Sequence, residues 1–159
     1  HRPDPKVPWA ESVGALAELL DEGKIQMAGV SNATVAQIDE AQQVLGGRLV
    51  SVQNEFSPRF RSSENELEHC GKIGVAFIPW SPLGGIGRTD RIQSDYPAFA
   101  EVAQELGVTP QQVTLAWMLA KGGHVVPIPG SSRPATATAS AEAAEISLTP
   151  EQVARLDAA

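Results

Sequence analysis

Residues 75–83 read Val-Ala-Phe-Ile-Pro-Trp-Ser-Pro-Leu, a short apolar run that ends abruptly in proline and polar residues. Runs of this length, bounded by turn-forming residues, are typical of buried β-strands. Three further runs of the same kind occur at Ile25–Val30, Leu49–Val52 and Val125–Ile128. Together with Val75–Ile78, the sequence therefore predicts four buried strands.

Helical periodicity fills the intervals between these strands and continues after the last of them. The predicted helices are Trp9–Glu22, Thr34–Val44, Glu64–Ile73, Ala98–Leu106, Pro110–Ala120, one to which the segment 129–134 leads and one from Pro150 through Leu156. Thr109 and Thr149 each precede a proline and stand three residues before a glutamine, which is a helix-capping pattern. This alternation of strands and helices favours parallel βα units.

Parallel strands of this kind fit either an open doubly wound sheet or one side of a (β/α)₈ TIM barrel. Polar or turn residues follow each predicted strand at once, at Ser31-Asn32, Gln53-Asn54, Trp80-Ser81 and Gly130-Ser131-Ser132-Arg133. Barrel enzymes carry their chemistry at successive strand ends, so this pattern favours the barrel. A complete barrel needs about 250 residues, and the chain has 159. We therefore expect its C-terminal half, about four βα units, with residues 1–159 forming a single domain.

Composition narrows the function further. The apolar fraction of 42% is near the globular average, so a packed core can form. The formal net charge is −7 and the basic residues are scattered, which argues against nucleic-acid binding. No apolar run approaches the ~18 residues of a membrane-spanning helix. We expect a soluble, cytoplasmic protein that binds neither nucleic acid nor membrane, and, because the chain starts at His1, the downstream part of something longer.

No metal site is predicted. Cys70 is the only cysteine, which excludes an intrachain disulfide, and its thiol is expected to be buried. His69 and His124 stand apart without metal-ligand spacing, so we expect both on the surface. The glycine-rich segment 84–87 is followed by no Lys-Ser or Lys-Thr, so it is not a P-loop, and we expect a mobile loop there.

Three of the strand-end clusters could contact a ligand in the mouth of the barrel. Ser31-Asn32 and Gln53-Asn54 offer hydroxyl and amide groups that suit a carboxamide, although Asn32 could instead cap the next helix while Gln53 satisfies backbone groups. The ring of Trp80 could cover a planar ligand or pack into the core.

The segment Gly130–Arg133 precedes a helix, where amides, hydroxyls and a guanidinium form an anion site that favours phosphate. Alternatively, Ser132 only caps that helix and Arg133 is only solvated. The residues by themselves leave both interpretations open.

Taken together and in this order, the motifs His-Arg-Pro-Asp-Pro, Gly-Val-Ser-Asn, Val-Gln-Asn-Glu-Phe-Ser-Pro, Pro-Trp-Ser-Pro-Leu-Gly-Gly and Ile-Pro-Gly-Ser-Ser-Arg-Pro resemble the aldo-keto reductase family. The resemblance runs over essentially the whole chain. It implies strands five to eight of the barrel, with His1 at the end of the fourth, and NADPH as cofactor. The cofactor-binding residues that it implies are Ser31, Asn32, Gln53, Trp80, Ser81, Pro82, Leu83, Gly84, Gly130, Ser131, Ser132, Arg133 and Ser140.

In the family pattern the first three of these residues hold the nicotinamide amide, Trp80 stacks on the ring, and the segment 81–84 wraps the pyrophosphate. The segment 130–133 holds the adenosine 2′-phosphate. The chain departs from many relatives at Thr136 and Ala139, where Arg and Glu are directed at the adenosine end. We therefore expect Arg133 to supply the missing positive charge.

The resemblance implies one catalytic residue in this chain, His1, which orients the substrate carbonyl. The family's Tyr general acid, Lys and Asp have no counterpart here, and Tyr96 does not match the catalytic tyrosine. Without that acid the developing alkoxide has no proton source, so the chain alone is expected to be inactive.

Three hypotheses follow. The first is the cofactor-binding half of an NADPH-dependent oxidoreductase that reduces a small aldehyde or ketone to an alcohol. The second is a non-catalytic nucleotide-binding or regulatory subunit, as in the barrel-shaped potassium-channel β subunits. The third is a self-associated half-barrel, because its open strand edges and apolar helix faces favour pairing with another copy.

Overall fold

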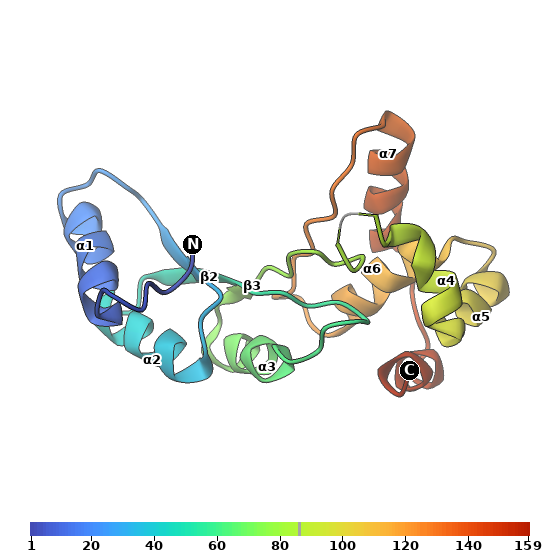
Figure 1. Ribbon diagram of the computed structural model, residues 1–159, viewed down its shortest axis with the longest axis horizontal. Coiled ribbons are helices and arrows are strands. Elements are labelled where there is room, and N and C mark those ends of the chain that lie inside the picture. Colours follow the sequence, from blue (N-terminus) through green and yellow to red (C-terminus); the bar gives the residue numbers. More distant parts are fainter. Residues whose placement is uncertain (86) are drawn as a thin grey trace. The chain divides into compact units, whose positions relative to one another are not determined.

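The computed structural model describes residues 1–85 and 87–159, so part of the predicted mobile loop, Ile86, lies outside the described residues. The chain is an α/β protein that divides into two compact units. Unit 1 comprises residues 1–54 and 63–78, and unit 2 comprises residues 55–62 and 79–159. Figure 1 traces the chain through both of them. The expectation of a single domain stays a prediction.

Unit 1 contains a parallel sheet with the strand order β1-β2-β3. The strands are β1 (Ala28–Ser31), β2 (Leu49–Gln53) and β3 (Ala76–Phe77), and the helices are α1 (Trp9–Asp21), α2 (Val35–Val44) and α3 (Glu64–Ile73). One helix precedes each strand along the chain, so the predicted alternation of strands and helices is confirmed in this unit.

The core of unit 1 follows from the two-residue period of its strands. Ala28 and Val30 of β1 are buried, whereas Gly29 between them is exposed. A side chain at Gly29 would collide with the hydroxyl of Ser51 on β2, so only glycine lets the strands approach this closely. Cys70 on α3 is buried as expected, and burial, followed by the charge of Glu66, raises the pKa of its thiol to about 11.

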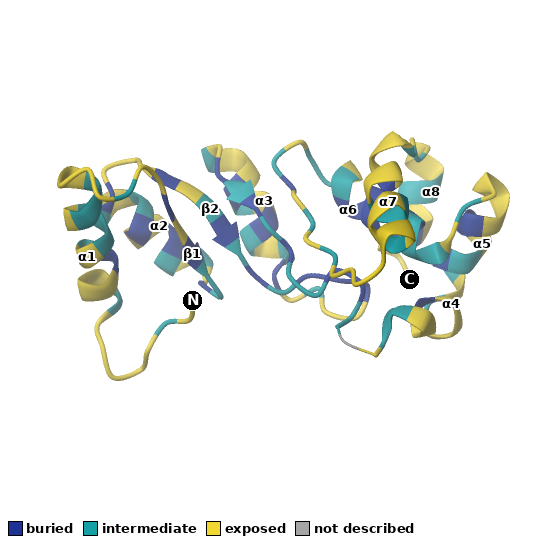
Figure 2. Cartoon of the chain, turned by 90° about the horizontal axis from the view of Figure 1, so that it is seen from above, coloured by how far each residue is buried: buried dark blue, intermediate teal, exposed yellow. Residues whose placement is uncertain are grey.

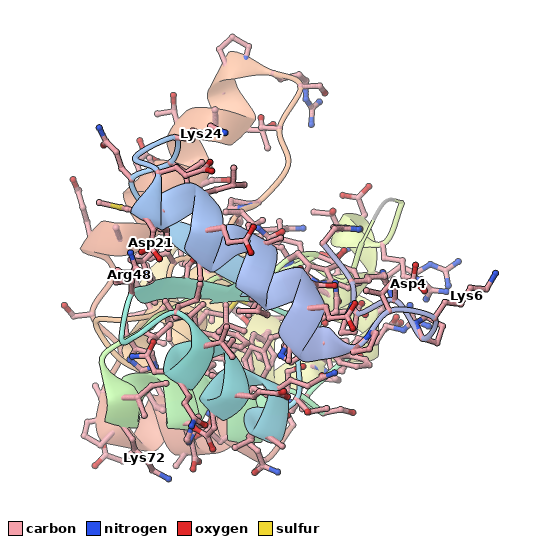
Figure 3. The ribbon with its side chains drawn as sticks, turned by 90° about the vertical axis from the view of Figure 1, so that its left-hand side faces the viewer. Asp4, Lys6, Asp21, Lys24, Arg48 and Lys72 are labelled. Atoms are coloured by element: carbon pink, nitrogen blue, oxygen red, sulfur yellow. The ribbon has the colours of Figure 1, made fainter. Side chains whose placement is uncertain are left out.

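An ion pair ties the end of α1 to the turn before β2. Arg48 Nη1 lies 2.8 Å from Asp21 Oδ1, and Figure 3 shows the two labelled side chains next to each other. Both side chains are largely exposed, so the pair contributes at most about 1 kcal/mol to stability.

Unit 2 is helical. Its helices are α4 (Ile92–Asp95), α5 (Pro97–Leu106), α6 (Pro110–Ala120), α7 (Pro134–Glu142) and α8 (Pro150–Asp157), with short 3₁₀ helices at Thr89–Arg91 and Ala143–Glu145. Thr109 and Thr149 cap α6 and α8 through capping boxes, as their spacing predicted. Helix α6 is buried without interruption from Val113 to Met118. Figure 2 colours the buried parts of the described chain dark blue. Helix α6 forms the centre of the unit.

The predicted strand at Val125–Ile128 does not join the described sheet, so the expectation of four sheet strands is wrong for this segment. The Ile128 N–H donates to the carbonyl oxygen of Pro79 at 3.4 Å. Pro79 and Pro127 lack an N–H group, so a regular ladder of hydrogen bonds cannot extend past this contact.

No helix in the described part of the chain is long and apolar enough to cross a membrane. Among residues 1–85 and 87–159, no group of three or more His, Cys, Asp or Glu side chains could hold a metal ion. His69 lies 2.6 Å from Asp39, and this contact joins α3 to α2.

Candidate functional site

The carboxyl ends of β1 and β2 bring Ser31, Asn32 and Gln53 together in unit 1. Ser31 is paired with Gln53 in the sheet, and its hydroxyl donates to the Gln53 carbonyl oxygen at 2.5 Å. The backbone N–H of Asn32 donates to the same oxygen at 3.0 Å. All three residues are half-buried, so their side chains remain accessible to a ligand.

Asn32 has a left-handed backbone, with φ of 55°. Its side-chain Nδ2 donates to Ser31 Oγ and to the carbonyl oxygen of His1, each at 3.1 Å. His1 and Ser31 also line one cavity of about 230 Å³, together with Trp9 and Val30. The structure thus gathers the predicted carboxamide residues and His1 at one end of the unit 1 sheet, while their roles stay a prediction.

Asn54 is not available to a ligand, contrary to expectation. It is buried, its Nδ2 donates to the Ala33 carbonyl at 2.8 Å, and its Oδ1 accepts the Ala33 N–H at 3.1 Å. The interpretation of Asn32 as a helix cap is also wrong. Thr34 caps α2 instead, and its hydroxyl accepts the Gln37 N–H at 3.4 Å.

Unit 2 contains an open groove made of two adjoining cavities of about 690 and 660 Å³. Its walls are the loop after Trp80, the segment before α7, and the first turns of α6 and α7. The predicted site residues in its lining are Ser81, Pro82, Leu83, Gly130, Ser131, Ser132, Arg133 and Ser140. Residues far apart in the sequence therefore line one groove.

The N-terminus of α7 gives this groove the character of an anion site. Arg133 is the N-cap residue, which excludes the alternative that Ser132 caps the helix. Its side chain is exposed and makes no hydrogen bond or ion pair within the part of the chain that the structure describes. The Ser131 hydroxyl donates to the Arg133 carbonyl at 2.9 Å and so holds the loop in place. A free guanidinium at a helix N-terminus attracts anions.

Two predicted cofactor residues, Trp80 and Gly84, lie outside the lining of the groove. Trp80 is half-buried, forms a bridge with Glu55, and accepts the Phe56 N–H at 3.4 Å through its carbonyl. Gly84 has φ of 86° and donates its N–H to the Ser81 carbonyl at 2.9 Å. This tight turn gives the segment 81–84 its shape.

Three residues that were not predicted also line the groove, Thr89, Asp90 and Gln111. Gln111 Nε2 donates to the Thr89 carbonyl oxygen at 2.9 Å and so joins α6 to the loop. The start of α6 was predicted, but no local signal shows which loop its first turn will face.

Known proteins resemble this chain over nearly its whole length. A family model described as "Aldo/keto reductase family" matches residues 1–159. The chain is 37% identical over 159 residues to an uncharacterized oxidoreductase of Schizosaccharomyces pombe, covering 99% of this chain and 49% of that protein. It is 34% identical over 146 residues to pyridoxine 4-dehydrogenase of Escherichia coli, covering 92% of this chain and 49% of that protein.

A solved structure of an aldo-keto reductase from Klebsiella pneumoniae in complex with NADPH matches with a TM-score of 0.84 at 27% identity. The match covers 99% of this chain and 56% of that one. The chain thus spans about half the length of the curated relatives it matches.

Proposed function

The chain belongs to the aldo/keto reductase family, and we propose that it is the cofactor-binding half of an NADPH-dependent oxidoreductase that reduces aldehydes or ketones. The parallel βα units of unit 1 then form part of a (β/α)₈ barrel, of which the chain supplies the C-terminal half. The named relatives are a pyridoxine dehydrogenase and an oxidoreductase, and the Klebsiella protein is in complex with NADPH.

The observation that carries the proposal is the groove of unit 2, with Arg133 in its lining. A dinucleotide phosphate needs a long open groove, donors for its phosphates and a positive charge for the 2′-phosphate. The two adjoining cavities offer the room, and the exposed Ser132 and Arg133 offer the donors. The residues present therefore fit the phosphate end of NADPH.

Unit 1 offers groups that suit the nicotinamide end. Ser31, Asn32 and Gln53 carry the hydroxyl and amides that a carboxamide needs, and one backbone oxygen holds the first two in place. Bound NADPH would supply the hydride. In the proposed function these residues orient the carboxamide, and His1 donates a hydrogen bond to the substrate carbonyl.

The chain alone is proposed to bind NADPH without turning over substrate. Proton donation to the developing alkoxide requires a group with a suitable pKa close to the carbonyl oxygen. The family's acid is a tyrosine, and Tyr96 packs edge to face against Phe99 in unit 2, with ring centroids 6.3 Å apart. Tyr96 is therefore part of the helix packing of unit 2, and we do not assign it the role of the acid.

Arg133→Ala is expected to weaken NADPH binding by about ten- to a hundredfold and to leave NADH binding nearly unchanged. The 2′-phosphate, which only NADPH carries, would lose its charge-assisted contact with the guanidinium. Fluorescence titration of the purified chain with both cofactors measures this difference, and NADPH absorbance after adding an aldehyde reports turnover. Arg48→Ala, at the unit 1 ion pair, is the control.

Equal losses for NADPH and NADH in Arg133→Ala would refute the role of this arginine. Absence of NADPH binding by the unaltered chain would count against the proposed cofactor site. Aldehyde-dependent consumption of NADPH would show that the chain has a proton donor of its own.

We also propose that the isolated chain self-associates through unit 1. Strand β1 is an edge of the described sheet, and Met27 and Val50 beside it are 69% and 41% exposed. Sedimentation velocity is expected to show a species of twice 16.8 kDa, and Val50→Lys is expected to shift it toward monomer. A monodisperse monomer at high concentration would contradict this proposal.

A further inference from the structure

The segment 55–62, which belongs to unit 2, is fastened at both of its ends, and the proposed function uses neither contact. At its start, Glu55 forms a bridge with Trp80, and the Phe56 N–H donates to the Trp80 carbonyl oxygen at 3.4 Å. Near its end, Arg61 donates to the last turn of α8. The segment therefore joins the C-terminal helix to the loop after Trp80.

The guanidinium of Arg61 satisfies the C-terminal end of α8. Its Nη1 donates to the Asp157 carbonyl oxygen at 2.9 Å, and its Nη2 donates to those of Leu156 and Ala159 at 2.8 and 3.2 Å. The last carbonyls of a helix have no partner within the helix, and the helix dipole makes this end negative. A planar cation with several donors suits such an end better than an ammonium does.

Arg61 and Phe56 also contact the same buried ring, that of Trp117. The Cζ atom of Arg61 lies 4.7 Å from the ring centroid, and Phe56 stacks on the indole with centroids 5.4 Å apart. Phe56 and Trp117 are both fully buried. Because close-packed side chains transmit displacements, a shift of Arg61 would reach Phe56 through these contacts.

Between its two ends the segment forms a closed turn. The Ser57 N–H donates to the Phe60 carbonyl oxygen at 2.9 Å, and the Phe60 N–H donates to the Ser57 carbonyl oxygen at 3.1 Å. Arg61 Nε donates to the carbonyl oxygen of the buried Pro58 at 3.5 Å. A turn that is bonded in both directions deforms little, so the segment is a stiff connection.

The Trp80 carbonyl, at the start of this connection, precedes one wall of the cofactor groove. Ser81 lines the groove and has a left-handed backbone, with φ of 51°, which is a strained conformation for a residue other than glycine. The Ser81 carbonyl oxygen accepts the Gly84 N–H at 2.9 Å. Strained turns persist only where their surroundings hold them, and the bond from Phe56 to Trp80 is one such restraint.

We propose that Arg61 is a positioning residue for the cofactor groove. It fastens the segment 55–62 to α8 and Trp117, and that segment holds the Trp80 carbonyl from which the wall 81–83 continues. Docking of the C-terminal helix and affinity for the cofactor are then coupled, so bound NADPH stabilises the docked α8 in return. The part of this inference that concerns NADPH rests on the proposed function.

The test compares Arg61→Gln with Arg155→Gln, a matched control on the same helix. Arg155 holds α8 through ion pairs with Glu101 and Glu105, and both of these partners lie in α5 rather than in the segment 55–62. Each variant therefore loosens α8, but only Arg61→Gln also releases the segment. Circular dichroism checks that both variants fold.

Hydrogen exchange without cofactor is the first measurement. Arg61→Gln is expected to speed the exchange of the Phe56 and Gly84 amides by about five- to tenfold, because the turn that they close opens more often. Arg155→Gln is expected to leave these two amides within about twofold of the unaltered chain. If Arg61 only stabilised α8, both variants would speed exchange in that helix alone.

Titration with NADPH is the second measurement. Arg61→Gln is expected to weaken NADPH binding by about two- to thirtyfold, the range typical of residues that couple two parts of a protein. Arg155→Gln should change it less than about twofold, because its ion pairs are exposed. Arg61→Lys keeps the charge without the planar donors and should give an intermediate loss, and it replaces Arg61→Gln if that variant does not fold.

The proposal is overturned if the Phe56 and Gly84 amides exchange equally fast in Arg61→Gln and Arg155→Gln. It is also overturned if the two variants have equal NADPH affinities, because the groove would then not depend on Arg61. Failure of the unaltered chain to bind NADPH would refute the proposed function, and hydrogen exchange would still decide whether Arg61 fixes the turn after Trp80.

Discussion

Replacing Trp117 with alanine is expected to lower the free energy of unfolding of unit 2 by about 3–5 kcal/mol. The Trp117 side chain is fully buried in α6. Its ring stacks on Phe56 with centroids 5.4 Å apart and meets Phe99 edge to face at 5.6 Å. Alanine would leave a cavity between these two rings, because the surrounding helices relax only partly.

The indole of Trp117 also anchors α8. Its Nε1 and Lys121 Nζ each donate to Asp157 Oδ1 at 2.7 Å. Burial disfavours the charged form of Asp157, but the hydrogen bonds from Lys121 and Trp117 outweigh it and hold the pKa of this carboxyl below its usual value. The resulting stabilisation is present at neutral pH and is lost as the pH falls through the lowered pKa.

Urea unfolding followed by circular dichroism measures the loss, and hydrogen exchange of the α6 amides locates it in unit 2. Trp117→Phe is the matched control, because it keeps an aromatic ring and removes the N–H donor, at an expected cost of about 1–2 kcal/mol. A Trp117→Ala protein within about 0.5 kcal/mol of the unaltered chain would contradict this account.

Asn54→Ala is expected to cost about 2–4 kcal/mol and to impair the carboxamide site next to it. Asn54 satisfies both the N–H and the carbonyl of Ala33, and all of these groups are buried. Alanine would leave the two backbone groups without partners and away from water. Ala33 follows Asn32 directly, so the turn that positions Ser31 and Asn32 would loosen.

The same unfolding measurement tests this expectation, with NADPH titration as the second readout. Gln53→Ala is the control from the neighbouring position, since Gln53 is half-buried and should cost less than about 1 kcal/mol. It should weaken NADPH binding without the loss of stability. Equal destabilisation by both substitutions would refute the structural role assigned to Asn54.

The helices of this protein could be predicted almost completely. Each predicted helix is present, and α6 and α8 begin where their Thr-Pro sequences place them. Capping and apolar periodicity act over a few residues, so a single sequence contains the whole signal. The three strands of unit 1 were predictable for the same reason.

The roles of individual polar side chains were less predictable. Asn32 and Asn54 looked alike in sequence, yet Asn32 Nδ2 donates to Ser31 and to His1, while both polar atoms of Asn54 bind the backbone of Ala33. The hydrogen bonds of Asn54 depend on Ala33, which lies 21 residues away in the chain. A local pattern has no information about such a partner.

The ordered series of strand-end motifs, readable without any coordinates, was sufficient to identify the family and to predict residues for a cofactor site, because each motif is short and local. Tertiary packing was needed for the rest: the failure of Val125–Ile128 to join the sheet, the Trp117 contacts with Phe56 and Asp157, and the groove of unit 2. Each of these features depends on groups that are distant in the sequence and come into contact only in the folded chain. Burial and pairing of these groups provide the stabilising free energy.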